Sequence, residues 1–180
     1  RPGTRYRFVL PDGLAIPDPA ARAQAGGPHG WSLVVDPHAY RWRHPAPARP
    51  WHEAVIWEAH AGLLGGFDGL RARLPGLAAL GITAIELMPI AAFPGARNWG
   101  YDGVLQFAPA EAYGPPDSLK ALIDEAHRLG LMMLLDVVYN HFGPDGNYLH
   151  CVAPQFFLRD RTTTWGDAID FARPEVAEFF

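Results

Sequence analysis

The feature that most constrains this sequence is a repeated unit in which a helical pattern ends at Leu-Gly and an apolar run follows. Residues 66–80 have apolar side chains at helical spacing, and the nearly continuous apolar run 82–90 comes next. The same order returns in the amphipathic pattern 118–129 and the apolar run 131–138. Because a strand reaches a parallel neighbour only through a crossover, this alternation predicts an α/β fold with a parallel sheet.

Local signals set the expected ends of these elements. A shorter apolar run, 55–57, stands before the first helical pattern, so three buried strands are expected. We expect Pro75 to restart the first helix as its N1 residue, because proline suits that position. Asp117 or Ser118 is expected to cap the start of the second helix, and Gly130 is expected to end it.

The first fifty residues have a different pattern. Residues 4–10 alternate between apolar and polar side chains, which predicts one half-buried strand. Residues 16–30 are rich in Pro, Gly and Ala without a period and predict a loop, whereas 33–35 predict a short strand. Three prolines in residues 44–50 indicate a stiff linker, so we place a domain boundary there.

The length of the chain sets a limit on this fold. It has 180 residues, whereas a complete eight-stranded α/β barrel needs roughly 250. A helical pattern that begins at Pro174 reaches the last residue, Phe180, within two turns, and the chain opens without Met. We therefore expect a piece of a longer chain.

Composition excludes several classes of function. A formal net charge of -4 disfavours a nucleic-acid-binding protein. No apolar run approaches the roughly 18 residues of a membrane span. The single cysteine, Cys151, excludes an internal disulfide and favours a cytoplasmic protein.

Candidate functional residues are sought just past the strands, because parallel α/β folds place function at the C-terminal strand ends. The polar and aromatic residues found there are Glu58, His60, Asn98, Trp99, Tyr101, Asp102, Asp136, Tyr139, Asn140 and His141. Asp136 lies inside an apolar run, where a carboxylate must be paired or hydrogen-bonded. It is interpreted either as a structural hydrogen-bond anchor or as part of a site.

Three of these residues suggest a sugar site. His141 lies where a strand meets its loop, with Asn140 beside it, and is interpreted as a site residue; the alternative is a structural histidine. Tyr101 lies next to Gly100 in a glycine-rich loop with Trp99 close by, and flat rings in such loops suit stacking on a sugar face. The alternative is a loop fixed by aromatic packing.

Motifs of other chemistries are missing from the sequence. It contains no Gly-x-Ser-x-Gly, no phosphate-binding loop and no dinucleotide-binding glycine motif. Its histidines do not have zinc-binding spacing. We expect no metal and no cofactor.

Several stretches of the sequence resemble segments of one enzyme family. Asp-Val-Val-Tyr-Asn-His at 136–141 resembles the first signature segment, on the third barrel strand, of the α-amylase superfamily, glycoside hydrolase family thirteen. Asn-Trp-Gly-Tyr-Asp-Gly at 98–103 resembles the loop after the second strand in branching enzymes and their relatives. Further similar stretches lie within 17–37, 85–95, 140–149 and 165–171, so the resemblance covers nearly the whole chain.

The resemblance implies a fold for each part of the chain. Residues 1–50 would be the tail of an N-terminal β-sandwich and its Pro-rich linker. Residues 51–180 would be the first three strands of a catalytic (β/α)8 TIM barrel, with a loop insertion after the third strand at about 142–170. The sequence departs from the family at 59–66, where a longer loop with threonines is usual.

The resemblance also implies roles for individual residues. Tyr101 matches the tyrosine that stacks on the sugar next to the scissile bond, and His141 matches the histidine that hydrogen-bonds that sugar. Asp102 and Trp99 are expected to take part in substrate binding. Asp136 and Asn140 match residues that shape the site from below; we do not carry over the calcium that the asparagine binds in some amylases.

The implied reaction is hydrolysis, with retention of configuration, of the α-1,4 bond next to the terminal trehalose of a maltooligosyltrehalose. The expected substrate is a maltooligosyltrehalose or another α-glucan. Retention needs two carboxylates about 5 Å apart, which the family takes from its fourth and fifth barrel strands. Glu58, Glu86, Asp102 and Asp136 form no convincing pair, so no catalytic carboxylate is assigned and both are expected beyond Phe180. The alternatives are a glycogen branching enzyme and a truncated glucan-binding module without catalysis.

Overall fold

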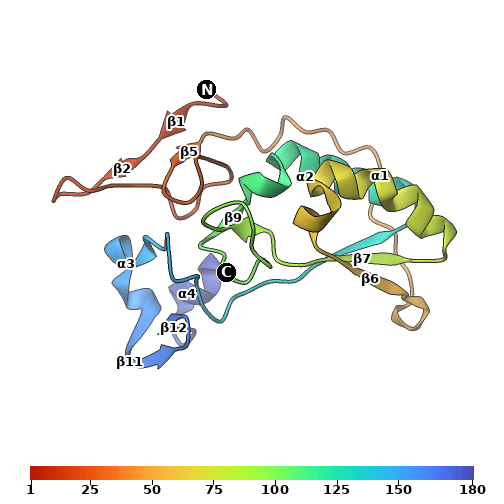
Figure 1. Cartoon of the computed structure of the whole chain (residues 1–180). Helices are drawn as coiled ribbons and strands as arrows, with labels where there is room; N and C mark the ends of the chain where they lie inside the picture. Colours follow the sequence, from red (N-terminus) through yellow and green to blue (C-terminus); the bar gives the residue numbers. More distant parts are fainter.

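A three-stranded parallel sheet with two helices on one face forms the centre of the computed structural model (Figure 1). The structure describes residues 1–158 and 160–180 with their side chains, and residue 159 by its backbone. The strands are β6 (Ile56–Ala59), β7 (Ala84–Leu87) and β10 (Met132–Leu135), in the order β10-β7-β6, and the helices are α1 (Gly66–Ala79) and α2 (Pro116–Arg128). The predicted α/β fold is confirmed.

The two faces of this sheet differ in cover. Trp57, Ile85 and Met133 are aligned in register and pack in the main hydrophobic core together with α1 and α2. The opposite face carries Glu58, Glu86 and Leu134, and no helix among the described residues packs on it.

The prediction of three buried strands is therefore wrong for the two outer strands. Ile56 of β6 is 39% exposed and Leu135 of β10 is 49% exposed. Both strands lie at edges of the sheet, and the two helices cover only one of its faces.

The sequence predicted that a helix restarts at Pro75, and this is wrong. Helix α1 runs through Pro75 without a break. Proline inside a helix removes one hydrogen bond and crowds the carbonyl four residues earlier. The helix continues because its apolar stripe is fully buried on the N-terminal side of the proline and reaches the core again beyond it, at Leu77.

Helix α2 starts two residues earlier than predicted. Its N-cap is Pro115 and Pro116 is its first residue, rather than a cap at Asp117 or Ser118. Proline suits the first helical turn because the N–H it lacks would be unpaired there. Gly130 follows the helix with a φ of 73°, so the predicted glycine stop is confirmed.

The N-terminal part contains short antiparallel strands. One sheet has the order β1-β5-β4, and a separate hairpin pairs β2 with β3. The bounds are β1 (Arg5–Tyr6), β2 (Phe8–Val9), β3 (Ala15–Ile16), β4 (Gln24–Ala25) and β5 (Trp31–Leu33). The single strand predicted at 4–10 is therefore two strands in different sheets, and the predicted loop 16–30 contains β4.

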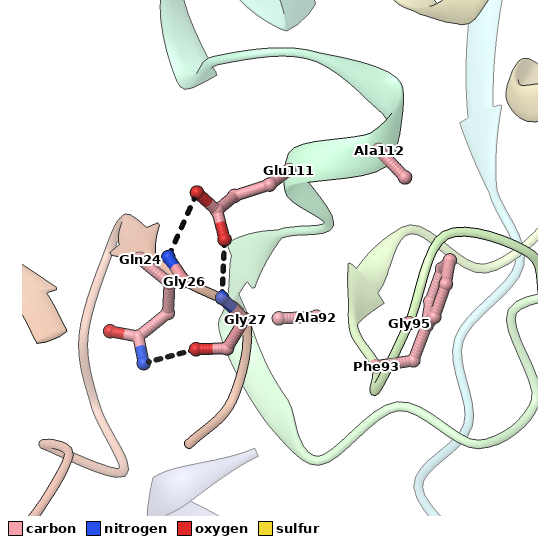
Figure 2. A pocket seen from close by; sticks show the side chains of 8 residues that line it. All are labelled: Gln24, Gly26, Gly27, Ala92, Phe93, Gly95, Glu111 and Ala112. Atoms are coloured by element: carbon pink, nitrogen blue, oxygen red, sulfur yellow. Dashed lines mark hydrogen bonds between the residues drawn. The ribbon is translucent and has the colours of Figure 1, made fainter. Parts of the chain in front are cut away.

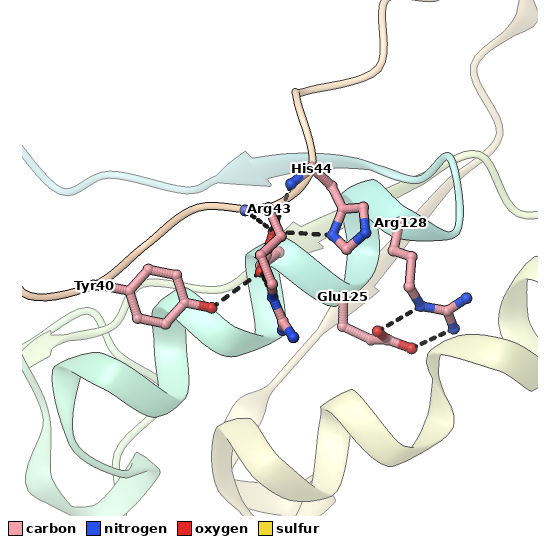
Figure 3. A network of polar contacts seen from close by, with 6 residues as sticks. Tyr40, Arg43, His44, Glu125 and Arg128 are labelled. Carbon is pink, nitrogen blue, oxygen red and sulfur yellow. Dashed lines mark hydrogen bonds and ion pairs between the residues drawn. The ribbon is translucent and has the colours of Figure 1, made fainter.

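The linker predicted at 44–50 has no regular structure, and the 3-10 helix η1 (Trp51–Glu53) follows it. Residues 40–44, which lead into the linker and include its first residue, are tied to α2 (Figure 3). The carboxylate of Asp124, which is 0% exposed, accepts hydrogen bonds from both the backbone and the side chains of Arg43 and His44.

Two segments predicted as loops contain hairpins. Strand β9 (Leu105–Pro109) lies within residues 94–116, whose Gly and Pro content predicts a loop, and it pairs with β8 (Ala91–Ala92) just before that stretch. In 143–170 the structure has α3 (Leu149–Val152) and the hairpin of β11 (Phe157–Thr163) with β12 (Gly166–Ile169). These strands were missed because they are short or polar.

The remaining elements are α4 (Pro174–Phe179), as predicted, and the 3-10 helices η2 (Ala61–Leu64), η3 (Glu111–Tyr113) and η4 (Pro154–Phe156). A second hydrophobic cluster joins α4 to the 142–170 segment through Phe142, Phe156 and Val176. Of the helices described, none has the length and apolarity that a membrane crossing requires.

Candidate functional site

Polar residues gather where β7 and β10 end. Strand β10 stops at Leu135, and the Asp136 N–H continues its ladder by bonding the carbonyl of Leu87 on β7 at 2.9 Å. This bond orients the backbone of Asp136 at the end of the sheet. Its carboxylate accepts a hydrogen bond from the Tyr101 hydroxyl at 2.9 Å, so the prediction that Asp136 must be hydrogen-bonded is confirmed.

The loop that carries Tyr101 is held by its own first residue. The Asn98 side chain accepts from the Gly100 N–H at 2.7 Å and donates to the Asp102 carboxylate at 2.6 Å. Gly100 has a φ of 104°, and a Cβ there would lie 2.1 Å from the Pro89 carbonyl oxygen. Only glycine fits this close approach, so the glycine next to Tyr101 is a structural requirement of the loop.

Tyr101 connects this loop to the residues that follow β10 through both its side chain and its backbone. Its hydroxyl donates to Asp136, and its carbonyl accepts from Nε2 of His141 at 2.9 Å. The hydrogen bond to Asp136 raises the pKa of Tyr101, with smaller contributions from burial and from the negative charges of Asp136, Glu58 and Glu86. The hydroxyl therefore stays protonated as a donor at neutral pH.

His141 is the most enclosed of the predicted site residues, with 5% exposure. Its Nε2 donates to the Tyr101 carbonyl, and among the described residues its Nδ1 has no hydrogen-bond partner. Its ring stacks on Trp165, with ring centroids 4.6 Å apart and planes inclined by 23°. Trp165 was not predicted to take part in the site, because nothing in its sequence position indicates this contact.

The predicted residues fall into a connected set and two outliers. Tyr101, Asp102, Asp136 and His141 are brought together, and loop 141–143 lies so close to the first loop that a Cβ on Gly143 would lie 2.2 Å from the Asp102 carbonyl oxygen. Trp99 is 75% exposed and Asn140 is also exposed. Within the described part of the chain, neither side chain makes a hydrogen bond or aromatic contact to this set.

His60, a candidate from its place after the first strand, and Tyr113, which was not a candidate, support the same loop. Both donate to the carbonyl oxygen of Asn98, His60 through Nε2 at 2.7 Å and Tyr113 through its hydroxyl at 3.0 Å. His60 could be suspected from its place after a strand. Tyr113 could not, because it lies in η3, within residues 94–116, a Gly/Pro-rich stretch that predicts a loop.

The carboxylates of this region do not offer a ready catalytic pair. Glu58 and Glu86 are register partners on neighbouring strands, on the face that the helices leave open. Asp102 is bonded to Asn98 and Asp136 to Tyr101. Among the described residues, no group of histidine, cysteine and carboxylate side chains has the geometry of a metal site.

The cavities of the structure are small. One of about 40 Å³ lies beside Asp136 and is lined in part by Gly100 and Tyr139. A larger one of about 240 Å³ lies away from these residues, where the Glu111 carboxylate accepts from the N–H groups of Gly26 and Gly27 (Figure 2). The larger cavity marks the contact of the N-terminal turn with η3 and holds none of the predicted site residues.

Comparisons with known proteins give consistent results. The family profile described as "Alpha amylase, catalytic domain" matches residues 21–161. A malto-oligosyltrehalose trehalohydrolase from Deinococcus radiodurans is 46% identical over 99% of this chain and 30% of its own length. A 1,4-alpha-glucan branching enzyme from Ralstonia nicotianae is 34% identical over 99% of this chain and 27% of its own length.

A solved structure is similar over almost the whole chain. The crystal structure of a putative alpha amylase from Salmonella typhimurium has a TM-score of 0.96 and 51% identity, over 99% of this chain and 31% of that one. The chain thus spans about a third of the length of the relatives it matches.

Proposed function

Because this chain belongs to the α-amylase family by its catalytic domain, we propose that it is part of a glycoside hydrolase that releases trehalose from maltooligosyltrehalose. The bond cleaved is the α-1,4 bond next to the terminal trehalose unit. The 46% identity to a malto-oligosyltrehalose trehalohydrolase supports this assignment. The activity is proposed for the whole protein, because the chain spans 30% of that relative.

The observation that carries the proposal is the connection between Tyr101 and His141. One residue follows β7 and the other follows β10, and they meet through a 2.9 Å hydrogen bond from Nε2 to a carbonyl. In this arrangement Tyr101, a residue that is 36% exposed, offers a flat ring for stacking on a sugar. His141, whose Nδ1 has no hydrogen-bond partner among the described residues, is proposed to hydrogen-bond the same sugar.

The other residues of the site have supporting roles in this proposal. Asp136 fixes the Tyr101 ring through the hydroxyl, and Asn140 shapes the site beside it. Asp102 and Trp99 are proposed to bind substrate. Trp99 is 75% exposed, which leaves its ring available for a glucan.

The chemical step needs two further carboxylates. Hydrolysis with retention uses a nucleophile and an acid/base about 5 Å apart, and passes through a covalent glycosyl-enzyme. The carboxylates of Asp102 and Asp136 are engaged by Asn98 and Tyr101. We therefore propose that the nucleophile and the acid/base belong to the part of the full-length enzyme beyond Phe180.

The domain organisation is part of the same proposal. Residues 1–50 are taken as the end of a β-sandwich with its linker, and 51–180 as the first three strands of a (β/α)8 barrel with an insertion at about 142–170. The antiparallel strands before residue 50 and the three parallel strands after it support this division. A cytoplasmic location and the independence from metals and cofactors remain predictions.

Incubation of the full-length protein with maltotriosyltrehalose tests the function. We expect free trehalose and maltotriose, with the anomeric configuration retained when the products are followed by NMR during the first turnovers. The 180-residue chain by itself is expected to release none. Absence of trehalose from the full-length reaction would contradict the proposal.

A glycogen branching enzyme is the second candidate, supported by the 34% identical relative. Such an enzyme transfers a glucan segment instead of passing it to water. Amylose given to the full-length protein separates the two: new α-1,6 branch points indicate the transferase, and trehalose from maltotriosyltrehalose indicates the hydrolase. A full-length protein that binds maltotetraose but yields neither product would be a binding module.

A further inference from the structure

Both nitrogens of the His60 imidazole are engaged, on opposite sides of the ring. Nδ1 accepts a hydrogen bond from the Leu63 N–H at 3.1 Å, which caps the 3-10 helix η2 that follows β6. Nε2 donates to the carbonyl oxygen of Asn98 at 2.7 Å. A neutral ring with its hydrogen on Nε2 satisfies both contacts, so one side chain joins the loop after β6 to the loop after β7.

The Asn98 carbonyl receives a second donor from a residue that is itself rigid. Tyr113 is 3% exposed, and burial raises its pKa to about 12, so its hydroxyl remains a donor to Asn98 at 3.0 Å. Its ring meets the His60 ring edge-on, with centroids 5.6 Å apart. Gly62 keeps this contact close, because a Cβ there would lie 2.8 Å from Tyr113 and 2.9 Å from His60.

Fixing Asn98 has a direct consequence for Tyr101. The Asn98 side chain holds Gly100 and Asp102, the two neighbours of Tyr101 in the chain. A displacement of Asn98 therefore disturbs the backbone at Gly100 and the side chain of Asp102, on either side of Tyr101. Through the Tyr101 carbonyl it also affects the hydrogen bond to His141. The path from His60 to the sugar-binding pair consists of two hydrogen-bonded steps.

We propose that His60 is a positioning residue for glucan binding, which sets the place of the Tyr101 ring through the carbonyl of Asn98. The inference rests on the proposed function, since it names a residue that serves the same site. His60 does not touch the substrate in this assignment. Its role requires an acceptor and a donor on one rigid ring, which no other neutral side chain supplies at this spacing.

The variant His60→Asn separates the two contacts. Asparagine is a good N-cap and keeps the acceptor for Leu63, but it is too short to reach the Asn98 carbonyl. His52→Asn is the matched control, because His52 is 82% exposed and its nearest charged contact is Glu53 at 3.9 Å. We expect His60→Asn in the full-length protein to lower kcat/KM for maltotriosyltrehalose about tenfold, mainly through KM. His52→Asn should stay within about twofold of the parent.

A double-mutant cycle with Tyr101→Ala distinguishes positioning from general destabilisation. If His60 acts through the Tyr101 ring, the effect of His60→Asn on kcat/KM falls to within about twofold once that ring is removed, whereas any effect on Tm persists. If His60→Asn still lowers kcat/KM about tenfold in the Tyr101→Ala background, the inference is overturned. It is also overturned if His60→Asn leaves kcat/KM of the otherwise unchanged protein as it was. If Tyr101→Ala itself leaves kcat/KM unchanged, the proposed glucan site falls and the inference falls with it.

Discussion

Two carboxylates, Asp124 on α2 and Asp136 just after β10, are used in different ways. Asp124 is 0% exposed, and its carboxylate accepts hydrogen bonds from Tyr40, Arg43 and His44, the residues labelled in Figure 3. Asp136 lies at the strand ends, is only half-buried, and is bonded through its side chain by the Tyr101 hydroxyl. The first has its acceptor positions filled, whereas the second keeps acceptor capacity free.

The difference teaches what each carboxylate is suited to do. Burial alone would raise the pKa of Asp124, but hydrogen bonds from Arg43 and His44 outweigh it and hold that pKa well below its usual range. A carboxylate saturated in this way fastens the segment before the linker to α2. Asp136, with one donor on a tyrosine ring, can orient that ring and still face the site.

The largest effect is expected from Asp124→Ala. The change leaves the backbone N–H groups of Arg43 and His44 without their acceptor and detaches segment 40–44 from α2. We expect Tm of the full-length protein to fall by about 5–10 °C, measured by differential scanning calorimetry. Asp136→Ala should lower Tm by less than half as much.

Asp117→Ala is the control for this comparison. Asp117 lies on the same helix, but its side chain is 75% exposed and its ion pair with Lys120 is long, at 3.7 Å. Exposed pairs of this kind contribute little, so Tm should change by about 1 °C or less. Equal losses from the variants at 117 and 124 would show that Asp124 is not a fastening point.

Sequence reasoning found one of these carboxylates and missed the other, for a physical reason. Asp136 stands in an uninterrupted apolar run, where a charge is conspicuous and must have a partner. Asp124 stands in an amphipathic helix, where a charge is expected on the solvent side. Its partners are 80 to 84 residues away in the chain, so only the folded structure reveals its burial.

The second prediction concerns acid. Because the pKa of Asp124 is lower in the folded protein than its ordinary 3.8, the ionised carboxylate stabilises the fold above about pH 3.8. That stabilisation is lost progressively as the pH falls below this value. The charged or titratable groups around it are Tyr40, Arg43, His44, Glu125 and Arg128.

Asp124→Asn isolates this contribution from that of Glu125, whose pKa is lowered by the hydrogen bond from Arg128. We expect the Tm difference between the parent and Asp124→Asn to be constant from about pH 7 to pH 5 and to shrink below about pH 4. Thermal melts across this range measure it. A difference that grows as the pH falls would have the wrong sign for a depressed pKa.

The site was predicted in part because topology alone brings strand ends together. Tyr101 and His141 follow neighbouring parallel strands, so their proximity could be expected, although the carbonyl-to-imidazole bond could not. Trp165 and Tyr113 were missed because they lie in a hairpin turn and a 3-10 helix, within stretches that the sequence predicts as loops.

Tyr101→Phe tests the site side of the comparison. The variant keeps the ring but removes the hydroxyl that donates to Asp136. Loss of one hydrogen bond to a charged acceptor at an exposed ring should lower kcat/KM for maltotriosyltrehalose about three- to tenfold. Tyr101→Ala should lower it further, because stacking is lost as well. Equal values for the two variants would mean that the ring itself contributes nothing.

Tyr40→Phe makes the same chemical change at the other carboxylate, and its effect should be the smallest. The Tyr40 hydroxyl bonds Asp124 at 3.3 Å, the longest of the contacts to that carboxylate, and Asp124 keeps its donors from Arg43 and His44. We expect Tm to fall by about 1–2 °C and kcat/KM to stay within about twofold of the parent. The two Tyr→Phe variants therefore remove the same kind of hydrogen bond but should differ in their effect. Tyr101→Phe should lower kcat/KM, and Tyr40→Phe should lower only Tm. A loss of turnover in Tyr40→Phe similar to that in Tyr101→Phe would mean that the two sides are coupled, and that Asp124 serves the site as well as the fold.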